Sequence, residues 1–234
     1  MKSDNGLPLI YCSVDTKDIG HARELIAAAT AAGCGIKLGL EFFNANGPQG
    51  VQMILDDGFS PSLFLDLKYH DIPNTVAQAV KAASSLDVAY LNLHASGGSE
   101  MMQAARRACA PKTKLLAVTV LTSLNESALE EVGQQGPASE QALRLARLTH
   151  AAGLEGVVCS AHEIKTLRNA LPKNFVLMVP GIRPEGSSVD DQRRVMTPRQ
   201  AVMEGATHLV IGRPITQAKN PEAAAKDIIA SIAA

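Results

Sequence analysis

The stretch FLDLKYHDIPNT (residues 64–75) places two carboxylates and an ammonium group within six positions, at the end of an apolar run: Asp66, Lys68 and Asp71. Side chains alternate across a β-strand, so Asp66 and Lys68 share one face while the leucines beside them pack on the other. Asp71 follows on the turn into a helix expected to start near Thr75. Acids around a lysine can stabilise developing charge and move a proton, so these residues are candidates for a catalytic site.

Two further charges are expected beside this group. Lys37 lies near the end of the apolar run GIKLGL, and Asp15 ends the run LIYCSVD. If these runs are consecutive parallel strands, five charges gather at the mouth of three neighbouring strands. The alternative is a rim of surface salt bridges, which would contribute little to stability. We favour a functional cluster, because partly buried ions cost several kcal/mol of desolvation unless something else selects them.

A second candidate site follows the last two apolar runs. These runs end in VPGIRP and IGRPI, which supply Gly181, Arg183, Gly212 and Arg213. Glycine lets the backbone approach an anion and arginine offers a bidentate fork, so the two turns predict a phosphate site. Gln192, in the long polar segment after VPGIRP, could join it, although alone it is typical of a solvated surface residue.

The elements that position these residues are eight short apolar runs separated by alanine-rich segments with helical spacing. Near-continuous apolar strands that alternate with helices favour a parallel sheet covered on its outer face, and eight such units predict a (β/α)8 TIM barrel of class α/β. Asn220-Pro221 and Thr197-Pro198 are typical helix starts. The predicted strands are residues 9–15, 35–40, 61–68, 90–95, 114–123, 156–161, 175–182 and 208–215.

Composition limits the classes of function. A chain of 234 residues with 46% hydrophobic residues and no visible linker predicts one domain over residues 1–234. Its net charge of -1 predicts no nucleic-acid partner, and no apolar run approaches the roughly 18 residues of a membrane span. The four cysteines are far apart, without C-x-x-C spacing, and indicate reduced core thiols in a cytoplasmic protein.

With these motifs identified, the chain resembles the orotidine 5'-phosphate decarboxylase family. The resemblance rests on the D-x-K-x-x-D pattern in DLKYHD, followed by IPNT, and then on NLHASGG, VLTS, PGIRPEGSSVDDQRRVMTP and IGRPI. It covers essentially the whole chain in the family's order, and the long motif around Gln192 is specific to the bacterial form.

The resemblance implies decarboxylation of orotidine 5'-phosphate to uridine 5'-phosphate and CO2 without a cofactor or metal, as the last step of UMP biosynthesis. It implies that Lys68 protonates C6, within a charged network of Lys37, Asp66, Lys68 and Asp71. It further implies a homodimer in which Asp71 and Thr75 reach into the partner's active site. The substrate-binding residues implied are Asp15, Lys37, Asp66, Thr75, Thr122, Arg183, Gln192, Gly212 and Arg213.

Two alternatives remain at this point. One is a magnesium-dependent sugar-phosphate lyase of the same superfamily, such as 3-keto-L-gulonate 6-phosphate decarboxylase or hexulose-6-phosphate synthase. These enzymes resemble the chain in D-x-K-x-x-D but place a glutamate metal ligand where Lys37 stands, and a cation there would repel Mg²⁺. The other is a catalytically silent nucleotide-binding barrel, which would need only the phosphate site.

Overall fold

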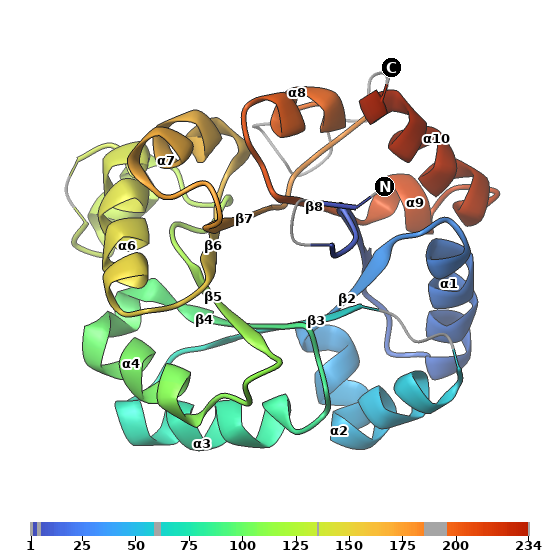
Figure 1. Cartoon of the computed structure of the whole chain (residues 1–234), viewed down its shortest axis with the longest axis horizontal. Coiled ribbons are helices and arrows are strands. Elements are labelled where there is room, and N and C mark those ends of the chain that lie inside the picture. The colour runs from blue at the N-terminus through green and yellow to red at the C-terminus, as the bar shows by residue number, and fades with distance from the viewer. Residues whose placement is uncertain (1, 4–5, 59–61, 135, 185–195, 234) are drawn as a thin grey trace.

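A computed structural model of the chain describes residues 2–3, 6–58, 62–134, 136–184 and 196–233. Within these residues, eight parallel strands close into a barrel in sequence order, and β8 pairs back onto β1 (Figure 1). The predicted fold class is therefore confirmed. The strands are β1 (Ile10–Val14), β2 (Gly35–Gly39), β3 (Leu63–Tyr69), β4 (Tyr90–His94), β5 (Lys114–Val118), β6 (Gly156–Val158), β7 (Val176–Val179) and β8 (His208–Ile211).

Helices surround the barrel on its outer side (Figure 1). Both predicted helix starts are confirmed: the Thr197 hydroxyl accepts the backbone N–H of Gln200, and the Asn220 side chain accepts that of Ala223. The helices are α1 (Ile19–Ala31), α2 (Leu40–Asp56), α3 (Pro73–Ser84), α4 (Gly98–Ala108), α5 (Glu126–Glu131), α6 (Ala138–Ala151), α7 (Ile164–Ala170), α8 (Pro198–Met203), α9 (Arg213–Thr216) and α10 (Pro221–Ala233).

The core has two parts because strand side chains alternate between the two faces of the sheet. The larger part packs outward-facing strand residues, such as Leu65 and Leu91, against the helices. The smaller part, which we call the inner cluster, fills the barrel with Tyr11, Phe64, Tyr90, Leu116, Val176, Met178 and Val210. Gly35 makes room for it, because a Cβ at that position would lie 2.6 Å from the Tyr11 ring.

Several strands end earlier than the sequence predicted. The predicted eighth strand was to reach Ile215, but β8 ends at Ile211 and α9 follows. Pro214 lies in the first turn of α9, and proline lacks the N–H that a strand ladder needs. The predicted fifth strand also ends early, at Val118, so that residues 120–122 line the mouth of the barrel. Helix α3 begins at Pro73 rather than near Thr75.

The cysteines are buried and free, as predicted for reduced core thiols. Burial raises the pKa of Cys12 to about 12 and the pKa of Cys34 and Cys109 to about 11, and it raises that of Cys159 as well. These thiols stay protonated near neutral pH, which makes them poor nucleophiles. Across the described residues, the helices are too short or too polar to cross a membrane.

Candidate active site

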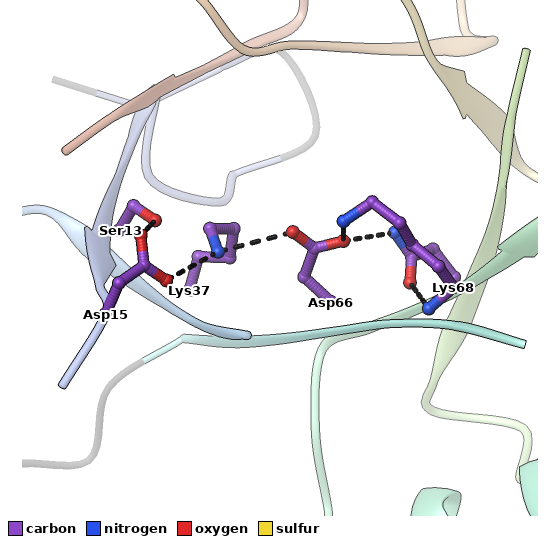
Figure 2. A network of polar contacts seen from close by, with 6 residues as sticks. Ser13, Asp15, Lys37, Asp66 and Lys68 are labelled. Carbon is purple, nitrogen blue, oxygen red and sulfur yellow. Dashed lines mark hydrogen bonds and ion pairs between the residues drawn. The ribbon is translucent and has the colours of Figure 1, made fainter. Parts of the chain in front are cut away.

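Four of the five predicted charges form one chain of ion pairs across β1, β2 and β3 (Figure 2). The Lys37 ammonium group lies 3.3 Å from Asp15 Oδ1 and 3.2 Å from Asp66 Oδ2. The Lys68 ammonium group lies 2.6 Å from the other oxygen of Asp66, Oδ1. Strand register brings them together, because Lys37 is paired with Phe64, and Gly39 with Asp66. The predicted alternation of charge is therefore present in the structure.

The middle of this charge network is buried and its outer end is open. The side chains of Lys37 and Asp66 are 9% and 14% exposed, whereas that of Asp15 is 54% exposed. Burial alone would raise the pKa of Asp66, but the charges of Lys37 and Lys68 and two hydrogen bonds outweigh it and hold the pKa below its ordinary value. Asp66 is therefore a carboxylate across the physiological pH range.

Two small residues hold the outer end of the network. Ser13 donates a hydrogen bond of 2.7 Å to Asp15 Oδ2, which leaves Oδ1 for Lys37. Gly39 keeps space open, since a Cβ there would lie 3.0 Å from Lys37 Nζ and 3.2 Å from Asp15 Oδ1. The Asp15–Lys37 pair therefore depends on a glycine at the end of β2.

The network forms one side of a cavity of about 290 Å³ at the carboxyl ends of the strands. Its apolar lining includes two members of the inner cluster, Phe64 and Val210. The segment after β5 contributes Val120, Leu121 and the predicted site residue Thr122. A flat, partly apolar group could therefore lie on this lining beside the charged side chains.

Four residues predicted to bind phosphate line the same cavity. Gly181, Arg183, Gly212 and Arg213 all line it. Gly181 has φ 79°, a left-handed conformation that favours glycine and turns the chain sharply after β7. Arg183 is 8% exposed and donates a hydrogen bond of 3.0 Å to the carbonyl of Ile182.

The described lining of the cavity carries both signs of charge: the cations Lys37, Lys68, Arg183 and Arg213 and the carboxylates Asp15 and Asp66. The guanidinium group of an arginine can bind two phosphate oxygens at once, so this lining can bind an anionic ligand.

Within this chain Asp71 lies outside the network, so the structure brings together four of the five expected charges. Its side chain is exposed, accepts a hydrogen bond of 2.6 Å from the adjacent backbone N–H of Ile72, and does not line the cavity. Thr75, in the first turn of α3, is also exposed and outside the cavity. Gln192 lies outside the described residues.

Two polar side chains of the site, Ser13 and Asn92, were not predicted from the sequence. Ser13 sits two residues before Asp15, so alternation could have placed it on the same face. Asn92 is the polar residue within the apolar run YLNLH, and it donates a hydrogen bond of 2.7 Å to Asp66 Oδ1. A polar residue inside an apolar run is the signal that could have identified Asn92 as part of the site. Asn92 is fully buried, and a buried asparagine needs hydrogen-bond partners.

The described residues hold no group of three or more histidine, cysteine, aspartate or glutamate side chains placed to bind a metal ion. The ammonium group of Lys37 lies between the carboxylates of Asp15 and Asp66. The space between these two possible metal ligands is therefore occupied by a positive side chain.

Fold and site together define a class: a (β/α)8 barrel whose mouth holds a lysine–aspartate network on one side and two arginines on the other. The chain belongs to the orotidine 5'-phosphate decarboxylase / HUMPS family, whose model matches residues 8–228.

Curated relatives cover nearly the whole chain. The orotidine 5'-phosphate decarboxylase of Idiomarina loihiensis is 49% identical over 229 residues, which span 97% of this chain and 98% of the relative. That of Nitrosospira multiformis is 50% identical over 215 residues, which span 92% and 89%. A solved structure, the orotidine 5'-phosphate decarboxylase of Lactobacillus acidophilus, matches with a TM-score of 0.85 at 32% identity and covers 97% of this chain and 100% of that one.

Proposed function

We propose that this protein decarboxylates orotidine 5'-phosphate to uridine 5'-phosphate and CO2, the last step of UMP biosynthesis. The observation that carries the proposal is the continuous Asp15–Lys37–Asp66–Lys68 network, which faces two arginines across one cavity. Support also comes from the names of the curated relatives, which are orotidine 5'-phosphate decarboxylases at 49% and 50% identity.

In the proposed complex the substrate lies across the cavity. Its phosphate binds Arg183 and Arg213, together with Gly212 and Gln192, because both arginines line the cavity and a guanidinium group binds phosphate oxygens in a bidentate manner. The ribose hydroxyls contact Asp15 and Lys37, and the pyrimidine lies near Thr122. This orientation brings C6 of the base and its carboxylate to Asp66 and Lys68.

The reaction then needs only charge and one proton. The bond between C6 and the carboxylate breaks, CO2 leaves as a neutral molecule, and the electron pair stays on C6. In the proposed complex the Lys68 ammonium group stabilises that charge and transfers a proton from Nζ to C6, after which solvent reprotonates the amine. Repulsion between Asp66 and the substrate carboxylate disappears as CO2 forms, because Asp66 remains ionised.

The magnesium-dependent alternative is disfavoured by Lys37. Magnesium prefers oxygen ligands in octahedral geometry, and carboxylates usually provide them. Here the Lys37 ammonium group is within 3.3 Å of both Asp15 and Asp66 and would repel a divalent cation between them. We therefore infer that the reaction needs no metal or other cofactor.

We also infer that residues 1–234 act as one catalytic domain and that two copies form a homodimer. Strands from both ends of the chain close the same barrel, which supports the single domain. The dimer is supported by the exposed loop beside the site, where Ile72 is 66% exposed between Asp71 and α3. In the proposed dimer Asp71 and Thr75 complete the partner's active site. Free buried thiols favour a reducing, cytoplasmic location.

Mixed dimers test the shared site. Lys68→Ala and Asp71→Ala chains are each expected to be nearly inactive. In a heterodimer of the two, one site has both substitutions and the other has neither, so random mixing of equal amounts should restore about a quarter of wild-type activity. No recovery, with heterodimers demonstrated by differential tags, would place Asp71 in its own chain's site.

The activity itself is tested by the ultraviolet absorbance of orotidine 5'-phosphate incubated with the purified protein, with and without EDTA. Conversion to the uridine 5'-phosphate spectrum at a rate that EDTA does not change is the expected result. Binding without conversion would instead identify a silent nucleotide-binding barrel. Absence of binding, with turnover of sugar phosphates in Mg²⁺, would identify the metal-dependent lyase.

A further inference from the structure

The backbone of β3 departs from regular strand geometry at Lys68. Leu65 pairs with Leu91 and Tyr69 with Leu93, so the three residues 66–68 lie opposite the single residue Asn92 of β4. Lys68 has φ 51°, and among the described residues only Asp87 shares a positive φ without being glycine. A lysine in this left-handed conformation is unfavourable by about 1 kcal/mol or more, and surrounding structure must hold it there.

Asn92 provides that support through both ends of its amide. Its Oδ1 accepts the backbone N–H of Lys68 at 2.8 Å, and its Nδ2 donates to Asp66 Oδ1 at 2.7 Å. The orientation of the amide is fixed by these partners, because an N–H must face the oxygen and a carboxylate must face the nitrogen. Asn92 is 0% exposed, so water does not replace either bond.

One carboxylate oxygen thereby connects the whole arrangement. Asp66 Oδ1 accepts from Asn92 Nδ2 at 2.7 Å and from Lys68 Nζ at 2.6 Å. Asn92 therefore fixes the backbone of Lys68 and also fixes the carboxylate that orients its ammonium group. The buried Asn92 amide therefore positions two groups: the backbone from which the Lys68 side chain extends, and the Asp66 carboxylate that the Lys68 ammonium group contacts.

We propose that Asn92 is a positioning residue for the decarboxylation, holding Lys68 in its left-handed conformation and the Asp66 carboxylate in the direction that aims Lys68 into the cavity. This role rests on the proposed function. Asn92 does not line the cavity, so it acts through its two hydrogen-bond partners, Asp66 and Lys68, which do.

Two variants separate positioning from simple structural support. Asn92→Leu removes both hydrogen bonds and keeps a side chain of similar size. We expect kcat/KM for orotidine 5'-phosphate to fall about 10- to 100-fold, the loss typical of a broken hydrogen bond to a charged group. The fall should appear in kcat, while the Kd of uridine 5'-phosphate should stay within about threefold, since most of its contacts lie at the phosphate side.

Asn92→Asp provides a signature that a structural role would not produce. As a carboxylate, the new side chain repels Asp66, but as a carboxylic acid it can donate to Asp66 and still accept from Lys68. The ratio of variant to wild-type kcat should therefore rise as the pH falls from about 8 to about 5.5. The charged and titratable groups nearest this position are Asp66, Lys68, Lys37, His94 and His70, and on β5 Asn92 pairs with the apolar Leu116. The wild type contains the same neighbouring groups, so a change in the ratio reports the carboxylate introduced at position 92, including its effect on those neighbours.

A matched control is Thr113→Val, which removes another buried side-chain hydrogen bond at the far end of the barrel. Thr113 is 1% exposed, and its hydroxyl donates to the carbonyl of Val88 at 2.8 Å. This variant should lose thermal stability comparably and keep wild-type kcat/KM. Circular dichroism at each pH verifies that every variant is folded where its rate is measured.

The outcomes are distinguishable. Wild-type protein without turnover would refute the proposed function, and with it the role of Asn92. Wild-type turnover combined with an unchanged Asn92→Leu enzyme would refute only the positioning role. If Asn92→Leu does not fold, the Asn92→Asp ratio decides: a rise at low pH supports the proposal, and a flat ratio overturns it.

Discussion

Acid should destabilise this barrel through His208, the first residue of β8. The residue is 0% exposed, and its ring contacts Tyr11 and Tyr90 of the inner cluster with 5.4 Å between ring centroids. Its Nδ1 lies 2.8 Å from the carbonyl oxygen of Pro8, and its Nε2 lies 2.9 Å from the Tyr90 hydroxyl. A carbonyl can only accept, so Nδ1 carries the proton and Nε2 accepts from Tyr90. The packing is therefore built around the neutral ring.

The size of the effect follows from the pKa. Burial lowers the pKa of His208 from 6.5 to about 4, against a smaller opposing contribution from the hydrogen bond to Pro8. The unfolded chain binds the proton more readily, so stability is fully present above the unfolded pKa and is lost as the pH falls toward the folded one. Between about pH 7.5 and about pH 4.5, this one group should lower the free energy of unfolding by about 2.5 kcal/mol.

Urea unfolding followed by circular dichroism at these two pH values measures the effect, with His208→Gln as the comparison. The variant should be less stable at neutral pH, because it loses a fitted ring, but its stability should fall by about 2.5 kcal/mol less than that of the wild type on acidification. His94, whose pKa burial also lowers, titrates in both proteins and cancels. An equal loss of stability in the two proteins would refute the reasoning.

Three substitutions in the cavity should separate its parts. Arg213→Ala should lower kcat/KM roughly 100-fold with little change in Tm, because in the proposed complex its guanidinium group binds the substrate phosphate; proportionate losses of activity and Tm would contradict this. Lys68→Ala should abolish turnover while calorimetry still detects uridine 5'-phosphate binding, and retained turnover would exclude Lys68 as the donor. Gly39→Ala should lower kcat/KM about 3- to 10-fold, because a methyl group would come within 3.0 Å of Lys37 Nζ and displace it from Asp15. Unchanged kinetics for that variant would show that the ion pair is not needed in its present geometry.

The fold and most of the charge network could be predicted from the sequence, because both depend on short-range rules. Strand alternation places Asp66 and Lys68 on one face, and consecutive parallel strands bring Lys37 beside them. The two arginine turns follow β7 and β8, so barrel closure brings them to one side of the cavity. These steps need the order of the strands and the alternation of side chains, and the observed register then sets the contact between Lys37 and Asp66.

What the sequence could not reveal depends on the register of the strands and on the position of residues beyond the strand ends. The role of Asn92 arises because three residues of β3 lie opposite one residue of β4. The sequence YLNLH does not predict this irregular pairing. The left-handed conformation of Lys68 has the same origin. Asp71 is close to the other charges in sequence, but it lies beyond the end of β3, is exposed and does not line the cavity.

The charge network also explains how the site can be stable when empty and still be ready for reaction. Lys37 and Lys68 carry two positive charges and Asp15 and Asp66 two negative ones, so the four side chains compensate each other without a ligand. Buried pairs of this kind contribute little net stability, because desolvation offsets their attraction. Their benefit is that the dipoles and charges are already oriented, so that little reorganisation is needed when charge develops on the substrate. In the proposed reaction the substrate carboxylate disturbs this balance beside Asp66, and loss of CO2 restores it with Lys68 next to the new carbanion. A strained lysine backbone at that one position is then the structural cost of pointing the proton at C6 before the substrate arrives.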